Sequence, residues 1–265
     1  MEQQVLISVG RIPRSPNDIF ERLLCGGLRD RMNMITYPIH ERFRTFQGEG
    51  VHMGRSAYFL RTFGCPVHCP WCDSAGTWHP EHIPRHIQRM TVEEIVIEVC
   101  EEPVVDFVVI TGGEPAVHNL QPLCDALVGL TQIHLETSGA FKLHGRFHHI
   151  TLSPKRWKMP LVEVVQQADE FKLIIEKPED IWFYTKFLKE CFAPSGITPP
   201  VWLHPEWSQR ENVEVLKAIS TAVVQKLWDV PFRAGWQLHK MYQVDKFDKR
   251  SRPPVPLGGD TTKGY

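Results

Sequence analysis

Short apolar segments with the character of β-strands recur along this chain of 265 residues, and helical segments separate several of them. Residues 90–100 are predicted to form a helix that begins with a capping box of Thr91 and Glu94, and residues 119–130 form a second helix. Apolar strands that alternate with helices are typical of a parallel sheet covered by helices. The pattern therefore predicts an α/β fold with a mainly parallel sheet. The strands are predicted at 56–63, 106–111, 133–137, 149–153, 170–175 and 201–203.

The composition is that of an ordinary globular protein, with 42% hydrophobic residues and 30 basic residues against 31 acidic ones. So balanced a charge gives no global attraction to nucleic acid or to an acidic membrane surface. No apolar run approaches the roughly 20 residues of a membrane span, and the first residues lack the basic start of a secretory signal. Seven cysteines, an odd count, favour a reducing cytosol over a disulfide framework. We therefore expect a cytoplasmic protein with neither nucleic acid nor membrane as a partner.

Three regions are expected along the chain. Residues 1–33 are predicted to be an N-terminal extension that contains a short capped helix at 14–27. Residues 34–245 carry the strands and form the core domain. Residues 246–265 are rich in proline and glycine towards their end, and we expect them to form a flexible tail.

The cysteines are scattered except for one cluster, in which Cys65, Cys69 and Cys72 follow a predicted strand with the spacing C-x3-C-x2-C. Three thiolates from one loop can hold three corners of a [4Fe–4S] cluster and leave the fourth iron open for chemistry. A zinc site is the alternative, with His68 or His79 as the fourth ligand. The remaining cysteines sit in apolar segments and are expected to be small buried hydrophobic residues: Cys25, Cys100, Cys124 and Cys191.

A second loop with ligand-binding character, I-T-G-G-E-P at residues 110–115, follows the next main strand. Gly112 and Gly113 have no side chains, so backbone carbonyls can approach a ligand closely, and Glu114 can accept hydrogen bonds from an ammonium group. Taken alone, this loop could equally be a tight turn before a helix. Because both loops follow the carboxyl ends of parallel strands, however, they are expected to meet on one rim, where such folds bind ligands.

Several motifs now resemble one family of the radical S-adenosylmethionine superfamily. The chain resembles the 7-carboxy-7-deazaguanine synthases, and this resemblance implies a modified partial (β/α) barrel that pairs as a homodimer. The motifs occur in order at residues 45–50 (T-F-Q-G-E-G), 59–74, 108–115, 135–139 (L-E-T-S-G), 152–155 (L-S-P-K) and 237–240 (Q-L-H-K).

The resemblance also implies a reaction, that of a carbon–nitrogen lyase in 7-deazapurine biosynthesis of the queuosine type. S-adenosylmethionine bound at a [4Fe–4S] cluster yields a 5′-deoxyadenosyl radical, which removes the hydrogen at C6 of 6-carboxy-5,6,7,8-tetrahydropterin. Ring contraction, return of the hydrogen and loss of ammonia then give 7-carboxy-7-deazaguanine. Mg²⁺ assists by binding the substrate carboxylate, and an electron donor such as flavodoxin or ferredoxin reduces the cluster.

The resemblance also implies which residues form the site, through the positions that match the family's motifs. Arg61, a cation in the middle of an apolar strand, suits a carboxylate because of its planar fork. Ser74 stands where many family members have the threonine that binds Mg²⁺, and its hydroxyl offers the same hard oxygen. The predicted substrate contacts are Phe46, Gln47, Gly48, Arg61 and Thr111. The predicted S-adenosylmethionine contacts are Trp71, Cys72, Asp73, Gly113, Glu114, Ser153, Pro154 and Lys155.

Two further segments match the family less closely. The family usually has Gln-Pro-x-Ser in a further cofactor segment, where this chain has His204, Pro205, Glu206 and Trp207, so an ordinary strand-exit loop is an equal alternative. Gln237 and His239 match a region that touches either the substrate or the dimer partner, and a buried structural histidine is the alternative there.

Two other functions stay open at this point. The chain could be a radical enzyme of another type, such as a glycyl-radical activase, which an assay with the carboxypterin would separate. It could also be a non-enzymatic protein that holds zinc or an iron–sulfur cluster, which iron and zinc analysis after anaerobic reconstitution would separate.

Overall fold

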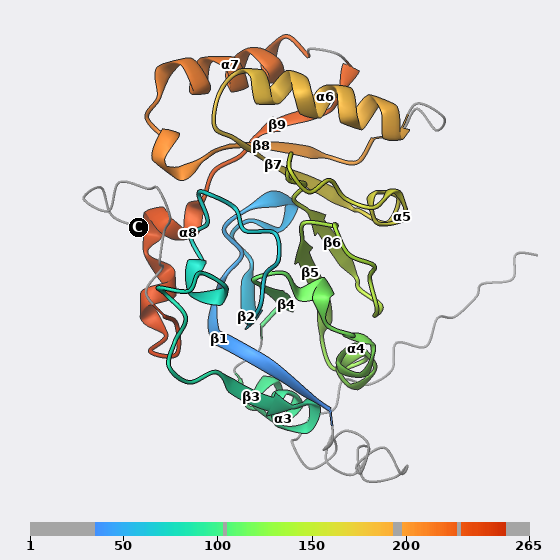
Figure 1. Ribbon diagram of the computed structural model, residues 1–265, viewed down its shortest axis with the longest axis vertical. Helices are drawn as coiled ribbons and strands as arrows, with labels where there is room; N and C mark the ends of the chain where they lie inside the picture. The colour runs from blue at the N-terminus through green and yellow to red at the C-terminus, as the bar shows by residue number, and fades with distance from the viewer. Residues whose placement is uncertain (1–34, 103–104, 193–197, 227–228, 253–265) are drawn as a thin grey trace, which may run out of the picture.

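The computed structural model describes residues 35–102, 105–192, 198–226 and 229–252. Within these residues, nine strands form one sheet in the order β3-β1-β2-β4-β5-β6-β7-β8-β9 (Figure 1). From β2 to β9 each strand pairs in parallel with its neighbour, whereas β1 is antiparallel to both β2 and β3. Because β3 and β9 are separate edges, the sheet is an open, partial (β/α) barrel. The strands are β1 (Thr36–Phe46), β2 (Ser56–Thr62), β3 (Gln88–Thr91), β4 (Phe107–Gly112), β5 (Gln132–Thr137), β6 (His149–Leu152), β7 (Glu170–Ile175), β8 (Val201–Pro205) and β9 (Phe232–Ala234).

The six predicted strands are all present as β2 and β4 to β8, with ends that shift by two residues at most. The predicted capping box is also confirmed. At the start of the helix, Thr91 Oγ1 accepts a hydrogen bond from the Glu94 backbone N–H at 3.1 Å, and Glu94 Oε2 accepts one from the Thr91 N–H at 2.7 Å. Reciprocal bonds of this kind satisfy two N–H groups that a helix start otherwise leaves unpaired.

Three strands were not predicted, and the longest of them is β1, with 11 residues. Its sequence mixes charged residues with apolar ones and contains Pro38, so it lacks the continuous apolar character of the buried parallel strands. Contacts across the sheet explain how it tolerates these charges. Arg42 Nε donates to Glu98 of a covering helix at 2.7 Å, and Glu41 accepts a hydrogen bond from Arg61 on β2 at 2.7 Å.

Helices cover the outer face of the barrel in two groups (Figure 1). The helices α3 and α4 pack on the first half of the sheet, where a core of residues from β1 to β6 includes Leu60, Ile110 and Leu135. The helices α6 and α7 pack on β7 to β9, around a second core that includes Leu173 and Leu203. The helices are α3 (Val92–Glu101), α4 (Gln121–Leu127), α5 (Val162–Val165), α6 (Glu179–Phe192), α7 (Val213–Val224) and α8 (Leu238–Tyr242). Short 3₁₀ segments are η1 (Gly50–His52), η2 (Ala75–Thr77), η3 (Pro115–Val117), η4 (Trp207–Gln209) and η6 (Val244–Phe247).

Three aromatic side chains from β1, β2 and β4 pack against one another within the sheet. Phe107, the first residue of β4, packs with Phe43 and Phe59 in a third apolar cluster. The rings of Phe43 and Phe59 are stacked, with centroids 5.7 Å apart. Folds of this kind bind ligands at the carboxyl ends of the parallel strands, where the predicted ligand loops lie.

The predicted extension 1–33, its helix at 14–27 and Cys25 lie outside the described residues. The first part of the predicted tail, residues 246–252, makes contacts with the barrel: the Arg250 guanidinium lies 2.9 Å from Glu98 and 2.5 Å from Glu102, and Glu41 accepts a hydrogen bond from the Arg252 N–H at 2.6 Å. No helix within the described residues is long and apolar enough to cross a membrane.

Candidate active site

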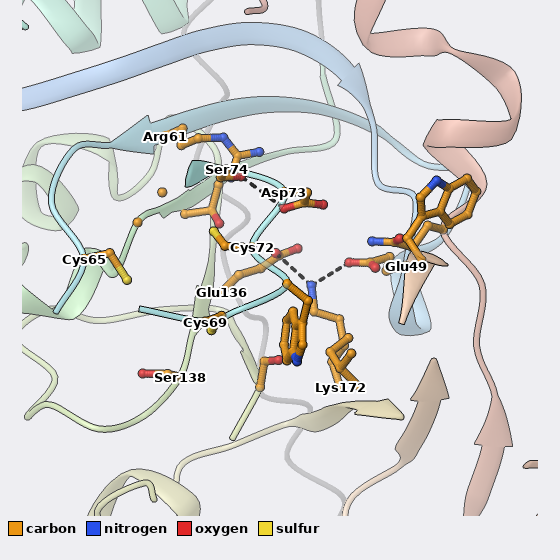
Figure 2. A pocket seen from close by; sticks show the side chains of 18 of the residues that line it. Glu49, Arg61, Cys65, Cys69, Cys72, Asp73, Ser74, Glu136, Ser138 and Lys172 are labelled. Atoms are coloured by element: carbon orange, nitrogen blue, oxygen red, sulfur yellow. Dashed lines mark hydrogen bonds and ion pairs between the residues drawn. The ribbon is translucent and has the colours of Figure 1, made fainter. Parts of the chain in front are cut away.

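A cavity of about 210 Å³ opens at the carboxyl rim of the barrel, and both predicted ligand loops line it (Figure 2). Figure 2 shows the thiol groups towards one side of this pocket and Glu49 towards the other, with Lys172 between Glu136 and Glu49. The lining contains most of the residues that the sequence predicts: Gln47, Arg61, Cys65, Cys69, Trp71, Cys72, Asp73, Ser74, Thr111, Gly113, Glu114, Ser153, Lys155, Pro205, Glu206, Trp207, Gln237 and His239.

The three clustered cysteines lie in the loop between β2 and η2 and are all free thiols. The loop turns back on itself, since the Cys72 N–H donates to the Cys69 carbonyl at 3.2 Å and His68 adopts a positive φ of 56°. Burial raises the pKa of Cys69 to about 12 and that of Cys72 to about 11, and it also raises the pKa of Cys65. Without a metal these thiols are therefore neutral, and a bound metal would have to displace their protons.

The positions of the three thiols bear on the choice between a zinc site and an iron–sulfur cluster. Two ligand atoms on one zinc ion lie at most about 4.6 Å apart, twice the 2.3 Å Zn–S bond. Among the described residues, Cys65, Cys69 and Cys72 form no group of three ligand atoms within 4.8 Å of one another, with or without His68 or His79. As placed in the structure, the three thiols therefore do not form a ready-made site for one zinc ion. A cubane cluster offers each thiolate its own iron and does not require the three sulfur atoms to converge on one point.

The loop after β4 packs tightly against the cysteine loop, and this packing explains its two glycines. A Cβ atom on Gly112 would lie 2.4 Å from the Thr62 carbonyl oxygen, and one on Gly113 would lie 2.4 Å from the Gly64 carbonyl oxygen. Gly112 also has a φ of +148°, within the range that favours glycine. The Glu114 N–H then donates to the Gly64 carbonyl at 2.9 Å, which joins the two ligand loops directly.

The Glu114 carboxylate is already fully hydrogen-bonded within the protein. Its Oε1 accepts from the Ala116 N–H at 3.0 Å and from the Thr137 hydroxyl at 2.5 Å, and its Oε2 accepts from both the N–H, at 2.8 Å, and the hydroxyl of Ser138. These four donors occupy all four lone-pair positions of the Glu114 carboxylate. Glu114 therefore braces the loop after β4 against the loop after β5, and this leaves the backbone of Gly112 and Gly113 to face a ligand.

The side of the pocket away from the thiols is a network of buried charges. Lys172 Nζ donates to Glu49 Oε2 at 2.5 Å and to Glu136 Oε2 at 3.2 Å, and Gln47 Nε2 donates to Glu136 Oε1 at 2.9 Å. Burial alone would lower the pKa of Lys172, but the two carboxylates raise it above its ordinary value overall. Burial likewise favours a higher pKa for Glu49, yet Lys172 and neighbouring histidines hold it well below its usual range. We call Gln47, Glu49, Glu136 and Lys172 the charged floor.

Arg61 and Asp73 supply opposite charges to another part of the pocket lining. Arg61 donates through Nε to Glu41, and this contact fixes the guanidinium and leaves its other nitrogens for the pocket. Asp73 accepts a hydrogen bond from Lys240 Nζ at 2.9 Å and one from the Ser74 hydroxyl at 3.2 Å. Burial raises the pKa of Asp73, but Lys240 and Arg61 lower it overall, so that Asp73 is an anion beside the Ser74 hydroxyl.

Aromatic and cationic side chains form the remaining wall. Lys155 Nζ donates to the Ser153 hydroxyl at 2.7 Å and lies 5.5 Å from the centroid of the Trp71 ring. Lys240 Nζ lies 5.0 Å from the centroid of the Trp207 ring. Flat apolar surfaces beside cations are suited to a ligand that combines an adenine or pterin ring with charged groups.

Four predicted site residues lie outside the pocket lining: Phe46, Gly48, Pro154 and His204. Phe46 packs edge-on against Tyr242, and the Gly48 carbonyl accepts a hydrogen bond from the Leu238 N–H at 3.0 Å. The Pro154 carbonyl accepts a hydrogen bond from the Tyr184 hydroxyl at 3.1 Å. His204 is fully buried behind the charged floor, with its Nδ1 3.8 Å from Glu49 Oε1.

The charged floor is the part of the site that the sequence analysis largely missed. Glu49 lies inside the quoted motif T-F-Q-G-E-G, and Glu136 lies inside L-E-T-S-G, but neither received a role. Lys172 gave a clear signal, because it is a cation in the middle of the apolar strand E-F-K-L-I-I, just as Arg61 is in β2. The other lining residues that were not predicted as contacts are Phe43, Phe59, Val67, Gly112, Thr137, Ser138, Ile174, Lys240 and Asp245.

Known proteins share both the sequence and the fold of this chain. Residues 46–146 match the family described as "4Fe-4S single cluster domain". A 7-carboxy-7-deazaguanine synthase of Synechocystis sp. is 43% identical over 214 residues, which cover 79% of this chain and 94% of the relative. The protein of that name from Escherichia coli (strain K12) is 35% identical over 233 residues, 78% of this chain and 99% of the relative. The crystal structure of QueE from Escherichia coli superimposes with a TM-score of 0.64 and 27% identity, covering 81% of this chain and all of that one.

The open barrel, the three-thiol loop at its rim and these similarities define a radical S-adenosylmethionine enzyme of the lyase class, with an iron–sulfur cluster and S-adenosylmethionine as cofactors. More narrowly, the chain belongs to the 7-carboxy-7-deazaguanine synthase family, because relatives with that name match nearly their whole length at up to 43% identity. These similarities favour this family over a zinc-binding protein or a glycyl-radical activase.

Proposed function

We propose that this protein converts 6-carboxy-5,6,7,8-tetrahydropterin to 7-carboxy-7-deazaguanine, with ring contraction and release of ammonia, in 7-deazapurine biosynthesis of the queuosine type. When bound, the cluster and S-adenosylmethionine supply the radical that removes the C6 hydrogen. The observation that carries this proposal is that one pocket holds both a three-thiol loop and a charged floor. The first suits an open-cornered cluster, and the second suits a polar heterocycle.

The charged floor is proposed to recognise the pterin ring. The aminopyrimidinone edge of a pterin presents N–H donors, which the carboxylates of Glu49 and Glu136 can accept. Glu49 and Glu136 both line the pocket, and Lys172 holds them in place through its contacts with Glu49 Oε2 and Glu136 Oε2.

The substrate carboxylate is proposed to bind between Arg61 and a Mg²⁺ ion held by Ser74. The Arg61 fork faces the pocket, and Glu41 fixes its orientation. The Ser74 hydroxyl and the Asp73 carboxylate are hard oxygen donors 3.2 Å apart, as a magnesium site requires. Thr111, next to Arg61 across the β2–β4 pairing, completes this wall.

The thiol side is proposed to orient S-adenosylmethionine. Cys65, Cys69 and Cys72 would hold three irons, and the backbone of Gly113 would face the amino acid part of the cofactor. The remaining proposed contacts are Trp71, Cys72, Asp73, Ser153, Lys155, Pro205, Glu206 and Trp207, all of which line the pocket. Glu114, whose carboxylate is already hydrogen-bonded, would act by bracing the loop after β4. Phe46, Gly48, Pro154 and His204 would act through these neighbours.

The proposal includes three properties that the family resemblance implies. An external one-electron donor such as flavodoxin or ferredoxin would reduce the cluster. The chain would pair as a homodimer, and it would act in the cytoplasm, where its cysteines stay reduced.

The test is an anaerobic incubation of reconstituted protein with the carboxypterin, S-adenosylmethionine, Mg²⁺ and a strong chemical reductant, followed by mass analysis. We expect about four irons per chain, a product with the mass of 7-carboxy-7-deazaguanine, released ammonia and undiminished S-adenosylmethionine. Stoichiometric cleavage of S-adenosylmethionine to 5′-deoxyadenosine without a deazapurine product would contradict the proposed reaction. An iron-free protein would contradict the cluster as well.

A further inference from the structure

A turn between the cysteine loop and β3 brings three metal-ligating side chains together outside the pocket. His79, Glu81 and His82 each offer one ligand atom, and these atoms all lie within 4.8 Å of one another. The turn is closed by backbone hydrogen bonds from the N–H groups of His82 (2.9 Å) and Ile83 (3.1 Å) to the His79 carbonyl. The His79 N–H in turn donates to Ala75 in η2 at 2.8 Å, which anchors the turn to the barrel rim.

The chemistry of this donor set indicates which ion it suits. Two imidazole nitrogens and one carboxylate oxygen are ligands that zinc and related divalent transition ions accept, whereas Mg²⁺ and Ca²⁺ prefer oxygen alone. The Glu81 N–H donates to His79 Nδ1 at 3.4 Å, which ties the backbone of the turn to the His79 ring. Three protein ligands leave the fourth tetrahedral position for water.

The turn is separate from the cluster loop but in contact with its flank. The ring of Trp78 lies between the two segments: it stacks on His68 with centroids 4.3 Å apart and meets His79 edge-on at 5.3 Å. His68 lies between Cys65 and Cys69. An ion that fixes the His79 ring would therefore restrict the movement of Trp78 and, through it, the outer side of the cysteine loop.

We propose that His79, Glu81 and His82 form a second metal site, which binds one Zn²⁺-class divalent ion in addition to the iron–sulfur cluster. The site uses none of the residues assigned to S-adenosylmethionine, Mg²⁺ or the pterin. Zinc found in a sample that also contains a full complement of iron would therefore be bound at this turn and not at the three cysteines.

The experiment titrates Zn²⁺ into anaerobically reconstituted, chelator-washed protein and measures iron and zinc per chain by elemental analysis. We expect one zinc per chain in addition to the iron, and at least a tenfold weaker Zn²⁺ affinity in H79A and in H82A. E81Q should bind more weakly than the unmodified protein but more tightly than either histidine variant. H86A is the matched control, because His86 is an exposed histidine of the same segment that lies outside the group.

X-ray absorption at the zinc edge then identifies the ligands. We expect a nitrogen and oxygen shell at about 2.0–2.1 Å. Sulfur at about 2.3 Å would place the zinc at the cysteines and overturn the proposal, as would unchanged affinity in H82A, or binding so weak that only millimolar Zn²⁺ saturates it. Iron content and circular dichroism show whether each variant is folded. Because no turnover is measured, a failure of the proposed reaction would leave this result unaffected.

Discussion

The thiol side of the pocket and the charged floor differ in how many of their interactions the protein forms before a cofactor or substrate binds. On the charged floor, Lys172 contacts both Glu49 and Glu136, so the charges are paired before any ligand arrives. On the thiol side, burial raises the pKa of Cys69 and Cys72, so these thiols stay neutral until a metal binds. The floor is preorganised, whereas the thiol loop is completed only by its cofactor.

This difference indicates how each side contributes to function. Charges that are fixed by one another keep their positions when a substrate enters, so recognition on the floor costs little reorganisation. Thiols with a raised pKa must lose protons to iron, so the chemistry of the other side depends on cofactor assembly. Loss of a thiol should therefore abolish function while the fold is kept, and loss of a floor charge should affect both.

The largest effect is expected from Cys69→Ala. The variant should retain its fold but lose one corner of the cluster, so that iron per chain falls sharply and neither the S-adenosylmethionine radical chemistry nor the deazapurine product is detected. Iron analysis, circular dichroism and product mass measure these outcomes. Cys191→Ala is the matched control, because Cys191 lies on α6, away from the pocket. Normal turnover by Cys69→Ala would show that the loop does not hold the cluster.

Lys172→Met should disrupt the floor. The methionine keeps most of the side-chain volume but leaves Glu49 and Glu136 without their cation, and removal of one partner from a buried ion pair costs about 3–5 kcal/mol. We expect a loss of this size in the free energy of unfolding by urea, together with loss of carboxypterin binding. Lys186→Met, at an exposed position on α6, should change stability by less than about 0.5 kcal/mol. Equal stability of the two variants would contradict the assigned role of the floor.

Substitutions of Arg61 test its proposed contact with the substrate carboxylate. Arg61→Ala should weaken carboxypterin binding about 100-fold, equivalent to about 2.7 kcal/mol, because a bidentate partner of the carboxylate is lost. Arg61→Lys keeps the charge without the fork and should lose less affinity. Affinity for S-adenosylmethionine should stay unchanged in both variants. If both ligands bind more weakly by the same factor, Arg61 has a structural role as the partner of Glu41.

The sequence predicted the thiol side better than the floor, for a physical reason. Spacing within one loop identifies Cys65, Cys69 and Cys72, because a metal site built from neighbouring residues is encoded locally. The pairing of Lys172 with Glu49 and Glu136 depends on three segments that are far apart in the chain. A lysine in a buried strand signals that some partner exists, but only the strand order identifies it.

The same reasoning explains which strands could be predicted. The parallel strands are buried on both faces and are recognisable as apolar runs. In β1, charged residues such as Arg42 and Glu41 are satisfied by side chains from other elements, so the strand does not show the pattern that predicts it. Likewise, the four donors to Glu114 come from two loops that only the fold brings together, and no motif shows that this carboxylate is already occupied.

His204 lies behind the charged floor, and its substitution is expected to have the smallest effect on stability. The side chain is fully buried, and its Nδ1 lies 3.8 Å from Glu49 Oε1, with neither atom hydrogen-bonded within the described residues. Burial lowers the pKa of His204 to about 4, and Lys172 and His239 act in the same direction although Glu49 opposes them. The folded protein therefore keeps His204 neutral at pH 5, whereas the unfolded chain protonates it below about pH 6.5.

Because the unfolded state binds the extra proton, His204 lowers stability as the pH falls from about 6.5 towards 4. Glutamine does not titrate and can donate to Glu49, so His204→Gln should lose about 1–2 kcal/mol less stability than the unmodified protein between pH 7 and pH 5. Urea unfolding at both pH values measures this difference, and contributions from other histidines cancel in it. His144→Gln, at an exposed position, should run parallel to the unmodified protein. If His204→Gln also runs parallel, the folded protein protonates this histidine over the same pH range as the unfolded chain does, and at pH 5 the floor then carries one more positive charge than Lys172 alone provides.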